Sequence, residues 1–274
     1  MSTAASRTTE LPSALDVVEP LLASARRVLV SLDYDGTLTP IVARPEIALL
    51  AQDVRHLVRE LAELCPTAIV SGRDREDVAR RVGVPEAFYV GSHGFDVVGP
   101  EGSDVALQLG DPYLPAIDAA EALLRERVAG IAGALVERKR YSVATHYRLV
   151  AREEVARVSQ VVDDVLAGFP SLRREPGKEV IEVQPNVAWD KGKAVLWLLE
   201  ALGLEDGLAF HVGDDLTDET VFAVLAERGV GIFVGEDDRP TAARFRLRDP
   251  GEVKQLLRHM IVLLRARTTG RARA

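Results

Sequence analysis

Two aspartates, Asp33 and Asp35, follow the apolar segment 28–32 and are separated by one residue. Side chains alternate between the two faces of an extended strand, so these two carboxylates point in the same direction. Carboxylates that share a pocket repel each other unless a cation lies between them or one of them holds a proton. The pair therefore predicts a magnesium site with a nucleophilic aspartate beside a general acid and base. A strand that simply ends in a turn at Gly36 is the alternative explanation.

A second group of acids follows the apolar segment 208–212 and packs four carboxylates into six residues. Its members are Asp214, Asp215, Asp218 and Glu219. Such crowding at the end of a strand is costly unless a cation is bound there. A helix that starts at Thr217 would favour the later acids in its first turn, but it does not explain the two adjacent aspartates that precede it. We therefore expect this group to complete the metal site of the first pair.

Two other segments suit an anion. Ser71, Gly72 and Arg73 follow the apolar segment 67–70, and a hydroxyl with free backbone N–H groups at the start of a helix can bind phosphate. Serine is also a common helix cap, so this segment alone is weak evidence. Lys191 begins a later helix, where its positive charge opposes the helix dipole. Contact with a phosphate or with a nucleophilic aspartate would explain that position, and a plain surface lysine is the alternative.

Alternating strand and helix patterns surround these residues. The strand patterns cover 28–32, 67–70, 88–90, 208–212 and 230–234. The helix patterns cover 51–64, 217–227 and 252–267, with further helices after residue 73 and from residue 191. Such alternation is typical of an α/β protein with a Rossmann-like parallel sheet, whose active site lies at the carboxyl ends of the strands. Each motif above falls at such an end.

The central region breaks this alternation. Its helix patterns cover 113–132 and 152–167, and its strand patterns cover 134–138, 142–147, 172–175 and 179–183. Adjacent strands joined by short loops predict an antiparallel sheet with two helices on one face. We therefore expect residues 104–184 to form an inserted α+β cap, and residues 1–103 and 185–274 to form the core.

The composition limits the classes of function. The 274 residues can bury a substantial core, and the net charge of −8 argues against a nucleic-acid or anionic-membrane partner. The apolar segment 260–264 is too short to span a bilayer, and residues 1–10 contain no apolar core of a signal peptide. Cys65 is the only cysteine, so no internal disulfide can form, and we expect a cytoplasmic protein. We also expect a monomer that acts on a small molecule. The first dozen residues and the basic segment from Arg265 are expected to be frayed ends.

Taken in order, the four motifs resemble those of the haloacid dehalogenase-like phosphatases. They are Asp33-x-Asp-Gly-Thr37, Ser71-Gly-Arg73, Asp190-Lys-Gly192 and Gly213-Asp-Asp-Leu-Thr-Asp-Glu219. The resemblance covers about residues 28–234 and narrows to the trehalose-6-phosphate phosphatases through five further segments. These are Thr39-Pro-Ile41, Gly91-Ser-His-Gly94, Glu137-x-Lys139, His146-Tyr-Arg148 and Glu182-Val-Gln-Pro185.

This resemblance implies a magnesium-dependent phosphatase that works through an aspartyl-phosphate. Asp33 would attack phosphorus, and Asp35 would protonate the departing oxygen and later accept a proton from water. The implied metal-binding residues are Asp33, Asp35 through its backbone carbonyl, Asp214, and, through waters or by orienting the loop, Asp215 and Asp218. The implied phosphate-binding residues are Thr37, Ser71, Gly72 and Lys191.

The implied substrate is trehalose 6-phosphate, with the sugar recognised mainly by polar residues of the cap. The residues expected to bind it are Arg73, His93, Glu137, Lys139, Arg148, Lys178 and Glu182. A solvent-facing polar side of the cap sheet is the alternative, and for His93 so is a hydrogen-bonded structural histidine. Two other functions stay open: a sucrose-phosphate or mannosyl-phosphoglycerate phosphatase, and a phospho-sugar sensor without turnover.

Overall fold

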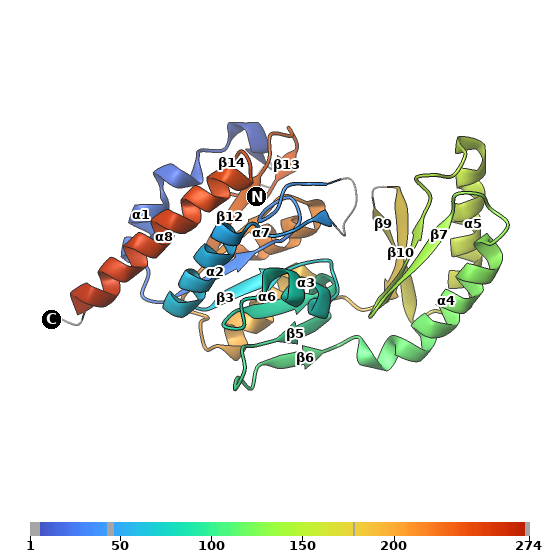
Figure 1. Cartoon of the computed structure of the whole chain (residues 1–274), viewed down its shortest axis with the longest axis horizontal. Coiled ribbons are helices and arrows are strands. Elements are labelled where there is room, and N and C mark those ends of the chain that lie inside the picture. Colours follow the sequence, from blue (N-terminus) through green and yellow to red (C-terminus); the bar gives the residue numbers. More distant parts are fainter. Residues whose placement is uncertain (1–5, 43–46, 178, 272–274) are drawn as a thin grey trace. The chain divides into compact units, whose positions relative to one another are not determined.

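The computed structural model describes residues 6–42, 47–177 and 179–271. The chain divides into two compact units (Figure 1). The first, called the core below, contains Met1–Leu107 and Trp189–Ala274. The second, called the cap, contains Gln108–Ala188. The cap is thus an insertion between two parts of the core.

Among the described residues, eight strands form the core sheet in the order β14-β12-β11-β2-β3-β4-β5-β6. The central strands are β2 (Val28–Leu32), β3 (Thr67–Val70), β4 (Phe88–Gly91), β11 (Leu208–Gly213) and β12 (Gly229–Val234). The three remaining strands are β5 (Asp96–Val98), β6 (Ala106–Gln108) and β14 (Phe245–Leu247), of which β6 and β14 form the two edges. The strands from β14 to β4 run parallel, and β5 pairs antiparallel with β4. The sequence analysis did not predict β5, β6 or β14, because each is only three residues long.

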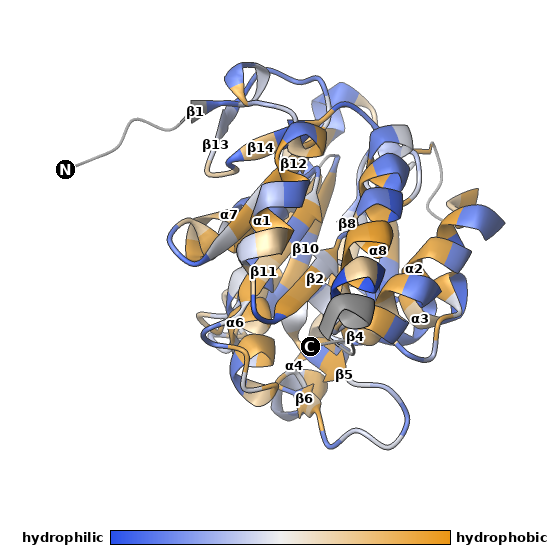
Figure 2. Cartoon of the chain, turned by 90° about the vertical axis from the view of Figure 1, so that its left-hand side faces the viewer, coloured by the Kyte–Doolittle hydropathy of each residue, from blue (hydrophilic) through white to orange (hydrophobic). Residues whose placement is uncertain are grey.

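Helices cover both faces of this sheet. They are α1 (Val18–Ser24), α2 (Gln52–Leu64), α3 (Arg75–Val82), α6 (Lys191–Ala201), α7 (Glu219–Leu225) and α8 (Pro250–Arg271). One apolar cluster joins α1, α2, α3 and α8 to the sheet through Val30 and Leu32, and another joins α6 and α7 to it through Leu29. Figure 2 shows apolar colouring along β2, β11 and β12, and mixed colouring on α2 and α8. Strands buried on both faces are what a parallel sheet with helices on both sides requires.

The cap is an antiparallel sheet with two helices. Among the described residues its strands follow the order β7-β8-β10-β9. They are β7 (Leu135–Lys139), β8 (Ser142–His146), β9 (Leu172–Gly177) and β10 (Val180–Pro185). Helices α4 (Leu114–Val128) and α5 (Val155–Leu166) share an apolar cluster with one face of this sheet, through Val143, Ile181 and Val183. The predicted fold class, an α/β core with an α+β insert, is confirmed.

Short helical turns connect several of these elements. The 3-10 helices are η1 (Thr8–Glu10), η2 (Ala14–Asp16), η4 (Ser92–Gly94), η5 (Asp111–Tyr113), η6 (Arg152–Glu154) and η7 (Leu216–Asp218). None of the helices in the described part of the chain has the length and hydropathy needed to cross a membrane.

The prediction of frayed ends is wrong for the described residues. Strand β1 (Ser6–Arg7) pairs antiparallel with β13 (Pro240–Thr241), and Arg7 forms an ion pair of 2.6 Å with Asp238. Helix α8 continues to Arg271, and the guanidinium of Arg267 donates to the carbonyl of Leu22 at 2.9 Å. Arg7 and Arg267 therefore have partners elsewhere in the core, which composition alone does not reveal.

Candidate active site

The acidic motifs lie together at the carboxyl ends of the central strands of the core sheet. Strands β2 and β11 are parallel neighbours, and Asp33, the residue after β2, donates its backbone N–H to the carbonyl of Val212 at 2.9 Å. Asp214 follows β11 directly, and Ser71 follows β3, the neighbour of β2 on its other side. The carboxyl ends of parallel strands are the usual place for an active site in such a sheet.

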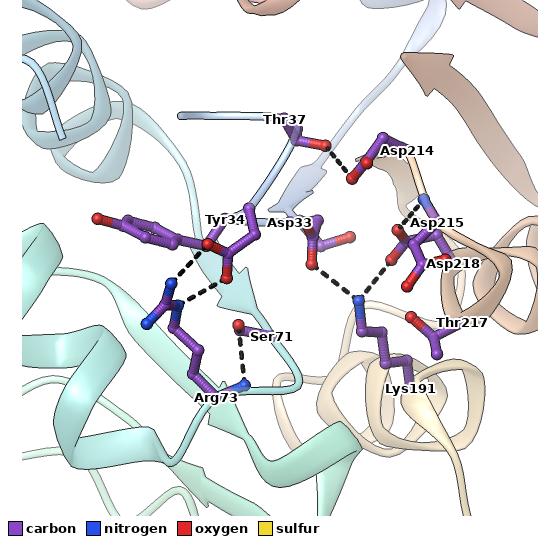
Figure 3. Close-up of polar contacts among 12 residues, drawn as sticks. Asp33, Tyr34, Thr37, Ser71, Arg73, Lys191, Asp214, Asp215, Thr217 and Asp218 are labelled. Carbon is purple, nitrogen blue, oxygen red and sulfur yellow. Dashed lines mark hydrogen bonds and ion pairs between the residues drawn. The ribbon is translucent and has the colours of Figure 1, made fainter. Parts of the chain in front are cut away.

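Lys191 joins the two acidic motifs. Its Nζ donates to Oδ1 of Asp33 at 2.8 Å and to Oδ1 of Asp218 at 2.8 Å (Figure 3). The side chains of all three are buried, with exposures of 3%, 6% and 0% for Lys191, Asp33 and Asp218. The positive charge of Lys191 at the start of α6 is unfavourable toward the helix dipole, but two buried carboxylates on either side of it stabilise that charge.

The electrostatics of this trio favour charged Lys191 and Asp218. Burial lowers the pKa of Lys191, but Asp218 and Asp33 outweigh it and raise that pKa above its ordinary value. Burial likewise raises the pKa of Asp218, but Lys191 and His211 hold it well below its usual range. The pKa of Asp33 is raised well above its ordinary value, because burial and the carboxylates of Asp218 and Asp214 outweigh Lys191. A cation bound beside Asp33 would favour its ionised form.

The sequence analysis missed His211, which lies on β11 under the trio. Its Nε2 lies 3.1 Å from Oδ1 of Asp218, and its Nδ1 lies 2.9 Å from Oγ of Ser31 on β2. Burial lowers the pKa of His211, which favours the neutral ring. A neutral ring can donate from Nε2 to Asp218, while the hydroxyl of Ser31 has one hydrogen to share between Nδ1 and the carbonyl of Phe210, which it contacts at 2.9 Å. A single histidine inside an apolar strand gives no signal for this role.

Asp214 and Gly36 are in close contact. Gly36 has a φ of +81°, and a methyl group at this position would overlap the carboxylate of Asp214. Oδ1 of Asp214 also accepts a hydrogen bond from Oγ1 of Thr37 at 3.3 Å. Burial and the carboxylates of Asp218 and Asp215 raise the pKa of Asp214 to about 7. Glycine is therefore needed here both for the backbone angle and for the approach of the carboxylate.

The carboxylates can hold a divalent cation. Asp33, Asp214 and Asp218 each offer an oxygen, and these three oxygens lie within 4.8 Å of one another. Asp218 already accepts from Lys191 and His211 at Oδ1 and from the backbone N–H of Asp215 at Oδ2. Asp33 and Asp214 are therefore better placed as ligands, and Asp218 is better placed to hold Lys191. A hard, oxygen-binding cation such as Mg²⁺ fits this donor set and would offset the raised pKa values.

The other two predicted metal residues face elsewhere. The carboxylate of Asp35 binds Arg73, with Arg73 Nε 2.6 Å from Oδ2 and its terminal nitrogen 2.7 Å from Oδ1. The carboxylate of Asp35 is thus held by Arg73, and a metal contact through its backbone carbonyl stays a prediction. Asp215 is exposed, and its carboxylate accepts from the backbone N–H of Leu216 at 2.5 Å, where it caps η7.

The segment from Ser71 to Arg73 does not begin the next helix. Helix α3 starts at Arg75, so Ser71 lies four residues before it, and the expectation of a helix start at this serine is wrong. Ser71 is buried, and its Oγ accepts from the backbone N–H of Arg73 at 3.1 Å. Gly72 lies so close to the imidazole of His93 that a methyl group at position 72 would overlap that ring. The structure thus brings Gly72 and His93 together beside β3 and β4.

The predicted cap residues share the sheet face opposite the helices. Glu137 on β7 and Glu182 on β10 both pair with Ala144 on β8, which places them on one face. Oε1 of Glu182 accepts from Lys139 at 2.9 Å, and Oε2 of Glu137 lies 2.8 Å from His146. The hydrogen bond from His146 lowers the pKa of Glu137, against the effect of burial.

Two predicted residues lie apart from that set. Arg148 follows β8 and pairs with Glu179 at 2.6 Å, and both side chains are about half exposed. Lys178 lies outside the described residues. The roles of all the cap residues toward a sugar stay predictions.

The comparison with protein families gives one match that spans most of the chain. A family described as trehalose-phosphatase matches residues 31–251. The trehalose 6-phosphate phosphatase RA3 of Zea mays is 41% identical over 268 residues, which cover 91% of this chain and 74% of that protein. The trehalose-phosphate phosphatase B of Arabidopsis thaliana is 37% identical over 265 residues, which cover 91% and 71% of the two proteins.

Solved structures give the same picture. The trehalose-6-phosphate phosphatase of Aspergillus fumigatus, in its crystal form 3, has a TM-score of 0.68 and 26% identity, covering 92% of this chain and 98% of that one. The C-terminal domain of the C. albicans trehalose-6-phosphate phosphatase has a TM-score of 0.76 and 22% identity, covering 92% and 99%. A haloacid dehalogenase-like hydrolase from Bacteroides thetaiotaomicron has a TM-score of 0.63 and 14% identity, covering 86% and 100%. The last two likenesses establish the fold of this chain.

Proposed function

Because this chain belongs to the trehalose-phosphatase family, we propose that it hydrolyses trehalose 6-phosphate to trehalose and inorganic phosphate, as an enzyme of trehalose biosynthesis. We propose further that the reaction depends on Mg²⁺ and passes through an aspartyl-phosphate. The observation that carries this proposal is the buried contact of 2.8 Å between Lys191 and Asp33, beside the carboxylate of Asp214. A carboxylate held by a cation next to a metal-binding group is suited to attack a phosphate ester.

In the first half of the reaction, an oxygen of Asp33 forms a bond to phosphorus. The bond between phosphorus and the sugar oxygen breaks, and the carboxyl proton of Asp35 moves to that oxygen as trehalose leaves. In the second half, Asp35 accepts a proton from water as the water oxygen attacks phosphorus. The bond between phosphorus and Asp33 breaks, which releases phosphate and restores the carboxylate.

The charge on the phosphoryl group is balanced by the chain's own residues and by the cation. Thr37 and Ser71, from the loops after β2 and β3, and Lys191, from the start of α6, would bind phosphoryl oxygens. Asp33, Asp214 and the backbone carbonyl of Asp35 would hold Mg²⁺. When bound, the metal reduces the repulsion between the anionic nucleophile and the anionic ester.

Selection of the sugar is assigned to the polar face of the cap sheet. Carboxylates and basic groups such as Glu137, Lys139 and Glu182 give directional partners for the many hydroxyls of a disaccharide. Contacts to the cap that must form before hydrolysis would make the rate depend on the correct sugar. A location in the cytoplasm and a monomeric state stay predictions.

The experiment that tests the proposed function measures phosphate release from a panel of sugar phosphates, with Mg²⁺ and with a chelator. We expect trehalose 6-phosphate to be the best substrate, with release lost in the chelator. A preference for sucrose 6-phosphate would move the assignment to another sugar-phosphate phosphatase. The absence of metal-dependent release from every member of the panel would indicate a sensor.

A further inference from the structure

The guanidinium of Arg73 donates hydrogen bonds to both carboxylate oxygens of Asp35. Its Nε lies 2.6 Å from Oδ2 and its terminal nitrogen lies 2.7 Å from Oδ1, so the contact is bidentate. The side chain of Arg73 is 12% exposed and that of Asp35 is 44% exposed. We propose that Arg73 is a positioning residue for Asp35, rather than a group that binds the sugar as its sequence motif suggested. The inference rests on the proposed function, in which Asp35 is the general acid.

Arg73 is itself held from two other sides. Another of its nitrogens donates to Asp77 on α3 at 3.2 Å. Its guanidinium lies 5.5 Å from the centre of the Tyr34 ring, and Figure 3 shows these two side chains. Asp77 also accepts from Arg81 at 2.7 Å. An arginine fixed at several points loses little further freedom when it orients a partner.

The backbone around Asp35 is fixed by the same group of residues. Arg81 donates to the carbonyl of Ala48 at 3.2 Å, and the hydroxyl of Tyr34 donates to that same carbonyl at 2.9 Å. Tyr34 is fully buried and directly precedes Asp35 in the chain. The contacts therefore close a ring that runs from Asp35 through Arg73, Asp77, Arg81, the carbonyl of Ala48 and Tyr34. This ring fixes both the backbone and the carboxylate of Asp35.

The orientation of Asp35 matters only for a leaving group that needs a proton. A sugar alkoxide is a poor leaving group and depends on a correctly placed acid, whereas 4-nitrophenolate leaves without one. The ratio kcat/KM reports on the steps up to departure of the leaving group, so the later use of Asp35 as a base does not enter it. A comparison of the two substrates therefore separates loss of positioning from loss of phosphate binding or of folding.

The experiment measures kcat/KM of Arg73→Ala, Arg73→Lys and the matched control Arg80→Ala. Arg80 also lies near Asp77, at 3.3 Å, but its side chain is 76% exposed and it makes no contact with Asp35. For Arg73→Ala we expect a fall of ~100-fold with trehalose 6-phosphate and of less than ~3-fold with 4-nitrophenyl phosphate, as for loss of general-acid catalysis. We expect partial recovery in Arg73→Lys, because lysine keeps the charge but not the bidentate contact. Inhibition by inorganic phosphate should be unchanged in all three variants.

Three results would overturn the proposal. One is an equal fall with both substrates, which would place Arg73 in phosphate binding. Another is weaker inhibition by inorganic phosphate, and the third is no fall with trehalose 6-phosphate. If Arg73→Ala does not fold, the variant Asp77→Asn, which keeps the guanidinium but removes its second anchor, must show the same selective loss in a smaller degree. If wild-type protein prefers another sugar phosphate, that alkyl phosphate replaces trehalose 6-phosphate, so a wrong substrate does not obscure the role of Arg73.

Discussion

Lys191 donates to Asp33 at 2.8 Å in a site where both side chains are more than nine-tenths buried. The two residues are 158 positions apart, and the whole cap lies between them in the sequence. Their contact brings the start of α6 to the end of β2. A buried carboxylate without this cation would be strongly disfavoured in its ionised form.

Replacement of Lys191 by methionine should therefore reduce both stability and activity. Removing one partner of a buried pair leaves the other uncompensated, and here Asp33 and Asp218 both lose their cation. We expect the free energy of unfolding at pH 7 to fall by about 3 kcal/mol or more, measured by urea denaturation with a chelator present. Lys193→Met, two residues further along the same helix, is the control and should change stability by less than about 1 kcal/mol. Equal stability of the two variants would contradict the structural role of Lys191.

Gly36→Ala should disrupt the metal site. A methyl group here would overlap the carboxylate of Asp214, whereas at Gly102, with a similar φ of +82°, a methyl group would meet nothing within 4 Å. Both substitutions carry the backbone cost of a left-handed residue, about 1 kcal/mol. Only Gly36→Ala should also raise the Mg²⁺ concentration needed for half-maximal activity, by ~10-fold or more, equivalent to one lost ligand contact. An unchanged requirement for Mg²⁺ in Gly36→Ala would show that Asp214 is not a ligand.

Stabilisation by Mg²⁺ should grow as the pH rises from 5 to 8. Burial and neighbouring carboxylates raise the pKa of Asp214 to about 7, above its value of about 3.9 in the unfolded chain. Between these values the folded protein binds more protons than the unfolded chain, so the metal-free protein loses stability as the pH rises. A cation binds the ionised carboxylate and removes this loss, so the shift in Tm caused by Mg²⁺ becomes larger over the same range.

The lowered pKa of Asp218 affects stability in a different pH range. Its stabilising effect is present above the unfolded value of about 3.9 and is lost only as the pH falls further, so it does not disturb the test. The measurement is thermal unfolding with Mg²⁺ and with a chelator, for wild type and for Asp214→Asn. The growth with pH should be absent or much reduced in Asp214→Asn. A shift of the same size at pH 5 and pH 8 in wild type would rule out a role for Asp214 ionisation.

The sequence predicted those site residues whose type is unfavourable at their local position in a helix or after a strand. Lys191 at a helix start, and Asp33 and Asp214 after apolar strands, each contradict local preference, and the structure brings them together. His211 could not be found in this way, because a histidine inside a buried strand is compatible with ordinary packing. The contact of Arg73 with Asp35 was also beyond prediction, since it joins side chains of two loops that local patterns do not place.

The elements of the fold also differ in how well the sequence predicts them. Long periodic segments such as α2 and α6 were located to within one residue at their starts, because burial of one face dictates their pattern. Short strands such as β5 and β14 depend on pairing with a neighbour, and their sequences carry little signal of a strand. The start of α3 was also misplaced, because two residues separate Ser71 from the helix cap at Asp74.

The sugar preference should depend on the polar face of the cap. Glu182 accepts from Lys139 and, at 2.5 Å, from Ser142, so its carboxylate is held in a defined position. We expect Glu182→Gln to lower kcat/KM for trehalose 6-phosphate by ~10-fold relative to glucose 6-phosphate, the worth of one charge-assisted hydrogen bond. Glu126→Gln, on the exposed side of α4, is the control and should leave the ratio of the two substrates unchanged. A ratio that is also unchanged in Glu182→Gln would move sugar recognition away from this residue.

The most direct test of the account is the fate of phosphate on Asp33. Wild-type protein and Asp33→Asn are each mixed with trehalose 6-phosphate and Mg²⁺, released phosphate is measured, and acid-quenched protein is examined by mass spectrometry for a phosphorylated aspartate. The account predicts phosphate release and a transient phosphate on Asp33 in wild type. In Asp33→Asn it predicts a folded protein with no such adduct and a rate lower by at least ~1,000-fold, as for loss of a nucleophile. Substantial phosphate release by Asp33→Asn, or an adduct on a different residue, would contradict it.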